Sequence, residues 1–332
     1  MKTDRQSQNP ADTRVTATGP DPRIRRRPLL TRLPRRTRLP LLLFLVALAA
    51  TGARGAEAQQ PIEARHDLRP DARLSIGAIH HALTITVWDR DEVEVVGTLD
   101  PATERLEVTG SDSDLSIQIE TDRGRSGTAN GRLELRVPPG VRLSAATVSG
   151  SIRAEGLTER ARLSTVSGSV ELDADVRDAE LNSVSGGVQV RGAIPRVEVN
   201  SVSGNVGLMG VGGRIEVSIV SGDVRIEADT PVEHLRGNTV SGRFELTGAL
   251  TSNASVEVRS HSGAIRFRIP QSTPVDAEIE TLSGAIRNGL TTDEARSPRF
   301  GPGNSLVFRI GEGTARLRVT SFSGSVSLER NP

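Results

Sequence analysis

Glu180, Glu198 and Glu216 recur at intervals of 18 residues and are the side chains of this chain most open to a chemical interpretation. Carboxylate oxygens are the ligands that hard cations such as calcium prefer, and paired carboxylates in a groove carry out glycoside hydrolysis. The strip could therefore hold calcium or another cationic ligand. The alternative is a solvated face on which Arg196 and Arg214, two residues earlier in their repeats, offset the repulsion between like charges. We favour the solvated face.

The remaining candidates give no catalytic, cofactor or metal site. His80 and His81 are adjacent, and neighbours on a strand point to opposite faces, so they are poorly placed to chelate one ion. His261 occupies a position that valine fills in most repeats, and we expect it to be a packed corner residue. The serine before each repeated glycine occurs nine times, whereas a nucleophile would occur once. The sequence therefore predicts no cofactor.

Composition narrows the classes of partner. Of the 42 basic and 41 acidic residues, 12 and 4 lie within residues 1–58, which leaves 30 and 37 and a net charge of −7 for the remainder. An acidic chain without a basic run has no long-range attraction to nucleic acid. There is no cysteine, which excludes disulfides and thiolate metal sites, and only 2% of the residues are aromatic. We expect an envelope protein or a glycan as partner, of unknown identity.

The first 58 residues have the pattern of a secretory signal. An arginine-rich stretch precedes the apolar run Leu39–Ala50, and Ala56-Glu57-Ala58 follows as a small-x-small cleavage pattern. The run is shorter than the roughly 20 residues that span a bilayer. We expect cleavage near Ala58 and a periplasmic or extracellular protein without a transmembrane segment. Arg35-Arg36 leaves twin-arginine export as the alternative to general secretion, and the length of the segment leaves the true start codon open.

A regular repeat must position all of these residues. Gly150, Gly168, Gly186, Gly204 and Gly222 are 18 residues apart, and Gly242, Gly263, Gly284 and Gly324 follow after 20, 21, 21 and 40 residues. Apolar residues stand seven and five before most of these glycines and two and four after most of them, and we expect the intervening residues to be polar and to face outward. No window shows the 3.6-residue stripe of a helix.

This pattern predicts an all-β, parallel β-solenoid with rungs of 18–21 residues, because one unit can bury its apolar face only against its neighbours. We expect a hydroxyl ladder three residues before the glycine, bonded from rung to rung. The predicted organisation is a secretory segment (1–58), a polar tether (59–73), an irregular N-terminal β cap (74–140) and the solenoid (141–330). Residues 305–310 and 315–319 are expected to form a C-terminal hairpin cap.

The chain resembles the putative-adhesin family of bacterial β-strand-repeat proteins, a domain of unknown function. The resemblance rests on the Thr/Ser-Val-Ser-Gly rungs, on Trp88–Val95 near the start, and on Gly311-Glu312-Gly313 before a last strand and a final Ser323-Gly324 rung. It covers roughly residues 70–330 and implies a β-solenoid of the cell envelope or outside the cell. It brings no catalytic or ligand residues.

Together these features predict a non-enzymatic envelope or surface protein, a scaffold or adhesin-like binding module. The alternative is a carbohydrate-active enzyme, a polysaccharide lyase or hydrolase, with the acidic strip as its groove. The turns are short and the outward residues have no focal point, which disfavours the enzyme. The sequence leaves open whether the stacks associate end to end.

Overall fold

The computed structural model describes residues 60–99, 104–121, 131–297 and 302–331, which all belong to one compact unit, Gly55–Pro332. Within these ranges the chain forms 24 strands and no helix, and thus no helix that could cross a membrane. The predicted secretory segment, residues 1–58, lies outside the described residues. The fold class is therefore all-β, as the alternating pattern of the sequence predicts.

Each central rung consists of a longer strand, a Ser-Gly turn and a shorter strand. The longer strands are β8 (Arg142–Ser149), β10 (Arg160–Ser167), β12 (Asp178–Ser185) and β14 (Arg196–Ser203). The shorter strands are β9 (Ile152–Glu155), β11 (Val170–Asp173), β13 (Val188–Arg191), β17 (Phe244–Thr247) and β19 (Ile265–Ile269). In β15 (Val206–Ser221) and β16 (Val224–Ser241) the shorter strand of one rung continues into the longer strand of the next, and β18 (Leu250–Ser262) carries the following longer strand.

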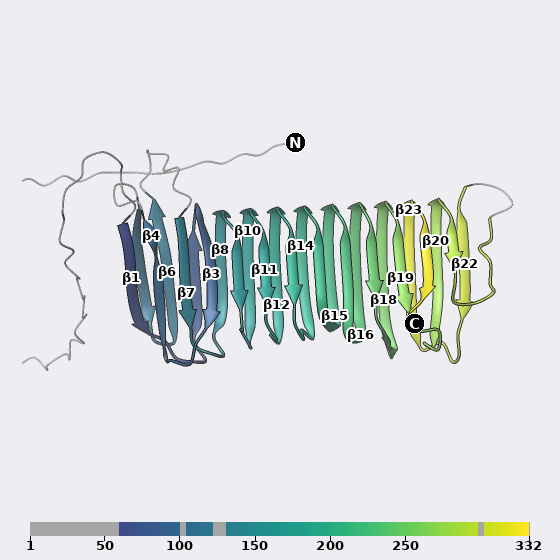
Figure 1. Ribbon diagram of the computed structural model, residues 1–332. Helices are drawn as coiled ribbons and strands as arrows, with labels where there is room; N and C mark the ends of the chain where they lie inside the picture. The colour runs from purple at the N-terminus through teal and green to yellow at the C-terminus, as the bar shows by residue number, and fades with distance from the viewer. Residues whose placement is uncertain (1–59, 100–103, 122–130, 298–301, 332) are drawn as a thin grey trace, which may run out of the picture. The chain divides into compact units, whose positions relative to one another are not determined.

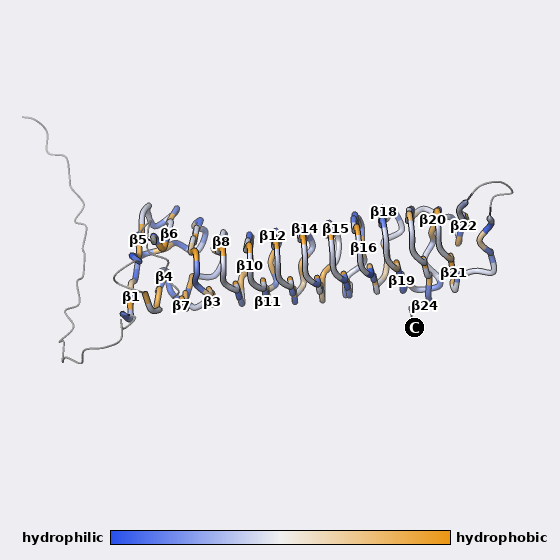
Figure 2. Tube along the Cα trace, turned by 90° about the horizontal axis from the view of Figure 1, so that it is seen from above, coloured by the Kyte–Doolittle hydropathy of each residue, from blue (hydrophilic) through white to orange (hydrophobic). Residues whose placement is uncertain are grey.

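The longer and shorter strands form two rows that enclose the core. From above, β8, β10, β12 and β14 lie along one side, and β3, β11, β19 and β24 lie along the other (Figure 2). Neighbouring rungs pair in parallel with the glycines aligned, so that Leu163 lies beside Leu181 and Val170 beside Val188. Val170, Val188, Val206 and Val224 form one inward stack, and none is more than 2% exposed. The predicted inward positions of these rungs are confirmed.

The repeated glycine is required by the turn itself. Gly168, Gly186 and Gly204 have φ angles of 151°, 142° and 132°, a region that L side chains rarely adopt. A Cβ on each would also overlap the carbonyl oxygen of the glycine in the preceding rung. The turns can therefore stack at the spacing of parallel strands, about 4.8 Å, only without a side chain.

The hydroxyl residues three before the glycine point inward and are buried, but they do not bond to one another as predicted. Thr165 Oγ1 donates to the carbonyl oxygen of Gly150 in the preceding rung at 3.1 Å, and Ser183 Oγ donates to the carbonyl of Gly186 in its own turn at 3.2 Å. These carbonyl oxygens can accept because each carries two lone pairs and the backbone ladder uses only one. The buried hydroxyls of Ser201, Thr239, Ser260 and Ser321 have no hydrogen-bond partner within the described residues.

The predicted polar tether, residues 59–73, is wrong for most of its length. Gln60–Asp67 forms strand β1, which pairs antiparallel with β4 (Glu92–Leu99). Every second residue of β1 is half-buried, beginning with Ile62. This weak alternation is enough for an edge strand, since β4 supplies partners for the backbone groups that a tether would leave to water.

At the N-terminal end the rungs are stacked out of chain order. Strands β2 (Arg73–Ala78) and β3 (His81–Val87) form one rung, and β6 (Asp114–Thr121) and β7 (Gly131–Val137) form another. The β2–β3 rung pairs in parallel with β6–β7 on one side and with β8–β9 on the other. Beyond it, β5 (Glu104–Ser111) pairs antiparallel with β6, and β4 with β7. The first rung of the sequence thus lies inside the stack.

The C-terminal end repeats this exchange. Strands β20 (Val275–Ser283) and β21 (Ile286–Asn288) precede β22 (Asn304–Arg309), β23 (Ala315–Ser323) and β24 (Val326–Arg330) in the chain. Yet β23 pairs in parallel with both β18 and β20, and β24 with both β19 and β21. Figure 1 shows the yellow β23 between β18 and β20 in the row. The last rung of the sequence is therefore also internal.

The predicted C-terminal hairpin of residues 305–310 and 315–319 is consequently wrong. β22 pairs antiparallel with β20, and β23 lies on the opposite side of β20. Inserted in this way, β23 has a hydrogen-bonded neighbour along both of its edges, whereas the outer strand of a hairpin would have one. The 40 residues from Gly284 to Gly324 include β21 and β22, which the chain forms before it returns as β23 to fill this place.

Candidate binding face

A line of exposed valines runs along the outer face of the longer strands. Residues seven, five and three before each glycine point inward, so strand alternation turns the residue two before it outward. Val166, Val184 and Val202 occupy this position and are 47%, 46% and 49% exposed. The expectation that the outward residues are polar is wrong at this one position. Strand alternation alone predicts that these valines face outward.

This line continues through ten rungs and is called the exposed ladder below. Strand pairing aligns its members in the spatial order Ile79, Val148, Val166, Val184, Val202, Val220, Val240, His261, Phe322 and Leu282. At the spacing of parallel strands it extends about 43 Å. Of the eleven large hydrophobic side chains that are exposed within the described residues, nine belong to it. Exposed apolar surface is thus concentrated on one face.

An open groove of about 1750 Å³ follows the ladder. Its lining includes a second row, four residues before the glycine, which is called the polar row: Ala146, Ser164, Asn182, Asn200, Ser218 and Asn238. Within this row Asn200 Nδ2 donates to Asn182 Oδ1 at 3.2 Å, and Asn238 Nδ2 donates to Ser218 Oγ at 3.5 Å. From Val148 to Val240 the groove is lined only by uncharged side chains. It offers apolar contact beside amide and hydroxyl groups.

Aromatic rings replace valine toward the C-terminal end of the ladder. His261 stacks on Phe322, with ring centroids 4.8 Å apart and an interplanar angle of 10°. Both side chains are exposed, so the expectation that His261 is a packed corner residue is wrong. The two residues are 61 positions apart in the chain and meet because β23 lies beside β18.

The three glutamates of the acidic strip lie on the same face as the ladder but do not line the groove. Glu180, Glu198 and Glu216 are in register on consecutive strands, as their spacing predicts, with Arg162 and Arg236 at the same position of the flanking rungs. Arg162 pairs with Glu180 at 2.9 Å.

Of the two arginines expected to offset the strip, Arg214 pairs with Glu216 at 3.7 Å. Asn200 donates to Glu198 at 3.1 Å. Across the described residues, no group of three or more His, Cys, Asp or Glu side chains is arranged to hold a metal ion. That the strip is a solvated face stays a prediction, with a binding role as its alternative.

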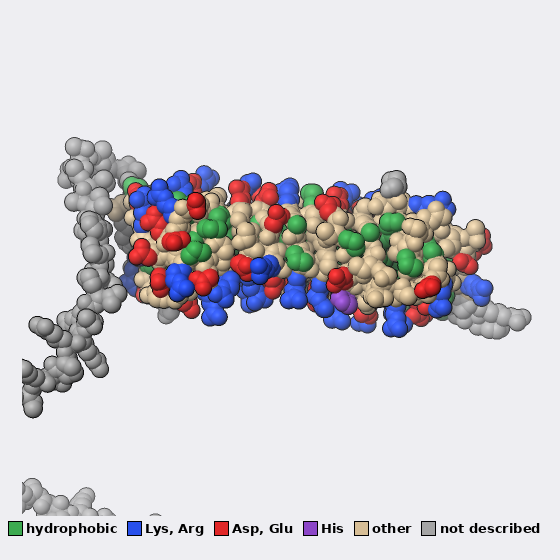
Figure 3. All heavy atoms as spheres, turned by 90° about the horizontal axis from the view of Figure 1, so that it is seen from below, with side chains coloured by type: hydrophobic (Ala, Val, Ile, Leu, Met, Phe, Trp, Pro, Cys, Tyr) green, Lys and Arg blue, Asp and Glu red, His purple; other side chains and the backbone are tan. Residues whose placement is uncertain are grey.

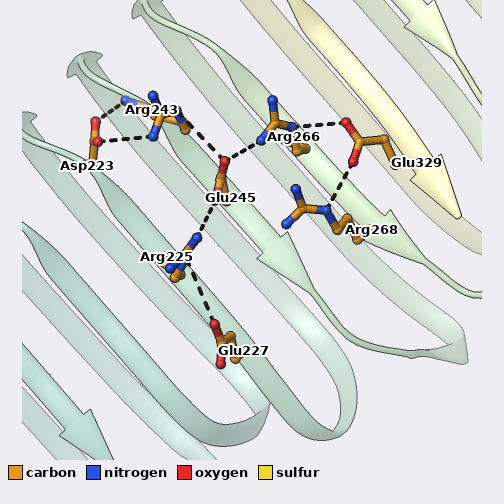
Figure 4. Close-up of polar contacts among 8 residues, drawn as sticks. All are labelled: Asp223, Arg225, Glu227, Arg243, Glu245, Arg266, Arg268 and Glu329. Carbon is orange, nitrogen blue, oxygen red and sulfur yellow. Dashed lines mark hydrogen bonds and ion pairs between the residues drawn. The ribbon is translucent and has the colours of Figure 1, made fainter. Parts of the chain in front are cut away.

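The outer face of the shorter strands has a different chemistry. Glu245 on β17 is only 5% exposed and lies among three arginines, with Arg266 at 2.8 Å, Arg225 at 3.5 Å and Arg243 at 3.8 Å (Figure 4). Glu329 on β24 then bridges Arg266 and Arg268, each at 3.0 Å. This ion-pair network also includes Asp223 and Glu227, so four acidic side chains balance four arginines. The network leaves no carboxylate of the eight residues unpaired.

A buried histidine lies at the turn of the β2–β3 rung. His81 is fully buried, and its Nε2 lies 3.5 Å from Oε2 of Glu104, while His80 is half-buried. Burial lowers the pKa of His81, against the opposing attraction of the Glu104 carboxylate. As alternation predicts, the two histidines do not face the same environment. The His81 ring packs against Gly131, where any side chain would overlap it.

Charged side chains are mixed over other parts of the surface. In the view of Figure 3, basic and acidic groups are interspersed along both long edges. Many of them form exposed pairs between neighbouring rungs, such as Arg160 with Asp178 at 3.1 Å and Arg318 with Glu278 at 2.7 Å. Such pairs each contribute about 1 kcal/mol or less to stability. They do not mark out a single charged site.

Comparison with known proteins supplies a family. The family model described as Toastrack DUF4097 matches residues 72–329, which is most of the chain and nearly all of its described strands. None of the curated proteins matches.

Several solved structures are similar at low sequence identity. A structure described as a "putative adhesin" from Bacteroides fragilis is 12% identical, with a TM-score of 0.43 over 82% of this chain and 98% of its own. A "putative lipid binding protein" from Parabacteroides distasonis is 13% identical, with a TM-score of 0.42 over 82% and 97%. A "putative cell adhesion protein" from Clostridium sporogenes is 10% identical, with a TM-score of 0.25 over 82% and 100%.

Proposed function

The chain belongs to the Toastrack DUF4097 family, and on that premise we propose that it is a non-enzymatic, adhesin-like binding module that works outside the cytoplasm, in the periplasm or at the cell surface. In this proposal the stack of rungs is a rigid support, and the outer face of the longer strands is the surface that binds. Export rests on the sequence of residues 1–58, with its basic stretch, short apolar run and Ala56-Glu57-Ala58.

The observation that carries the proposal is the concentration of exposed apolar side chains in one ladder. Nine side chains, each about 40–50% exposed, present an apolar strip on the order of 600 Å², at the upper end of what monomeric proteins leave uncovered. Placing valine outward at six successive rungs has no benefit for the core, because these side chains do not contribute to it. A surface kept apolar over this length is explained by a partner that covers it.

No observation favours the carbohydrate-active enzyme. Such an enzyme needs two carboxylates, or a carboxylate and a basic group, facing a bound sugar. The central groove has an uncharged lining. The group of carboxylates and arginines around Glu245 lies on the other face and is paired internally.

Binding of the purified protein to isolated envelopes of the producing cell tests the proposal. The test variant carries Val184→Glu, Val202→Glu and Val220→Glu, which place charges along the ladder without touching the core. The control carries Glu180→Gln, Glu198→Gln and Glu216→Gln in the same rungs. We expect loss of binding in the first and retention in the second. Equal binding by both variants, or turnover of a polysaccharide by the wild type, would show that the proposal is wrong.

A further inference from the structure

We propose that the partner of the exposed ladder is a second copy of this chain, and that two stacks associate side by side in the same direction through their ladders. This inference rests on the proposed function, since it names the occupant of the same face. It is argued from the period, the shape and the charge of that face.

The period of the ladder selects its partner. Ladder side chains repeat about every 4.8 Å along the stack, whereas a peptide strand laid along it repeats about every 3.3 Å per residue and an α-helix every 5.4 Å per turn. Both would fall out of step with the rungs within a few repeats. A second copy of the chain has the same rung spacing because it has the same fold. Contacts made at one rung can therefore be made again at every rung.

The shape of the face selects the parallel arrangement. The ladder and the polar row run side by side, and the ladder is the ridge because its valines are exposed, whereas the polar row apart from Ala146 is half-buried. A two-fold axis along the stack places the ladder of each copy over the polar row of the other. An axis across the stack would instead bring ridge against ridge. Only the parallel arrangement therefore fills both grooves.

Charge points the same way. The central groove is uncharged from Val148 to Val240, so two copies can meet there without placing like charges together. Within the polar row Asn200 donates to Asn182 and Asn238 donates to Ser218, so part of its hydrogen bonding is met inside each copy when the valines of the other copy cover it. The acidic strip of Glu180, Glu198 and Glu216 lies to one side of the groove. The parallel arrangement keeps the two strips on opposite sides, and the antiparallel one would bring them face to face.

The area is sufficient for a specific association. A stable complex covers about 800 Å² on each partner. The apolar strip, on the order of 600 Å², approaches this area, and the polar row that lines the same groove extends it. The contact is isologous, because the same patch serves on both copies, and it closes after two.

The first test is the molar mass of the protein over a range of concentrations by sedimentation velocity. We expect a reversible dimer. Val184→Glu, Val202→Glu and Val220→Glu together should weaken it at least about a hundredfold, because each charge would be buried without a partner. The matched control introduces three glutamates at outward positions away from the ladder, Thr158, Gln189 and Thr230, and should leave the dimer unchanged. A wild type that stays monomeric at every concentration overturns the inference.

The second test needs no destabilising variant. The sequence contains no cysteine, so Val166→Cys and Val240→Cys, each made singly, give one thiol per copy, about 19 Å apart along the stack. A short bismaleimide should link each variant to itself. In an antiparallel pair only the rung on the axis can meet its own copy, so linkage of one variant alone, or only of one variant to the other, would refute the arrangement.

The two tests also separate this inference from the proposed function. If the wild type is monomeric and the ladder variant still loses envelope binding, the module binds a different partner and the second copy is excluded. If the dimer forms and envelope binding is unaffected by the ladder variant, self-association stands and the proposed function fails.

Discussion

The two outer faces of the stack differ in the side chains that they place at positions repeated in every rung. Both are rows of parallel strands whose outward side chains repeat every rung. On the face of the shorter strands, arginine and carboxylate side chains alternate between rungs and satisfy one another, as around Glu245. On the face of the longer strands, identical valines repeat and remain exposed. The first face is complete by itself, and the second is complete only when something covers it.

The largest effect on stability is expected from a comparison of an inward and an outward residue on the same strand. Leu181 and Val184 lie on β12, the first fully buried and the second 46% exposed. Leu181→Ala should destabilise by about 2–4 kcal/mol, since it leaves a cavity in a close-packed interior. Val184→Ala should cost about 0.5 kcal/mol or less, as surface substitutions do. Denaturant unfolding of both variants measures the difference, and equal losses would contradict the assignment of faces.

On the outer face of the shorter strands, substitution of Glu245 should lower the stability of the protein. Glu245→Gln removes the shared charge and leaves Arg225, Arg243 and Arg266 close together with less compensation. We expect a loss of about 1–3 kcal/mol. Because arginines then repel one another, added salt should recover part of it. Glu155→Gln, an exposed partner of Arg153 on β9, is the control and should be near neutral. A salt-independent loss would mean that packing, not charge, is the cause.

Acidification should affect the N-terminal end through His81. Burial lowers the pKa of this histidine in the folded protein, so the unfolded chain binds a proton more readily. Stability should therefore be full above the unfolded pKa of about 6.5 and should fall as the pH drops below it. His81→Asn should flatten this part of the profile of unfolding free energy against pH. If the profile keeps its slope, the pH dependence arises from other groups. His66 would then be substituted first, because burial also lowers its pKa.

The smallest effect on stability is expected where the effect on surface chemistry is largest. Val184→Thr, Val202→Thr and Val220→Thr together keep the β-branched shape and add hydroxyls at exposed positions. The free energy of unfolding should change by no more than about 0.5 kcal/mol per site. Retention on a hydrophobic-interaction column should fall clearly, whereas Glu245→Gln should leave it unchanged. If the threonine variant is retained as strongly as the wild type, the ladder is not the main apolar surface.

The central rungs could be predicted from the sequence because each residue sees the same neighbours as its counterpart 18 residues away. Glycine spacing alone aligned Leu163 with Leu181 and Val170 with Val188. The register of Glu180, Glu198 and Glu216 followed in the same way. The exposed ladder was also within reach, since the alternation that buries Thr165 turns Val166 outward.

The ends could not be predicted because a repeat states which residues share a position and not which rungs are neighbours. Residues 315–323 fit the pattern of a rung equally well after β21 or between β18 and β20. The choice depends on whether β23 gains hydrogen-bonded partners on one edge or on both, which is a property of the assembled stack. The stacking of His261 on Phe322 depends on that choice and has no local signal in the sequence.

The exchange of rungs at both ends has a consequence for how the length of this protein can change. A stack in simple chain order can lengthen by adding a unit at either terminus. Here the first and last rungs of the sequence are each enclosed between two others, so an appended unit would find no free place beside its neighbour in the chain. Duplication or deletion of whole units is compatible with the fold only in the interior, between β10 and β18. A stack of this kind would therefore lengthen by duplication of repeat units in its interior and not at its ends.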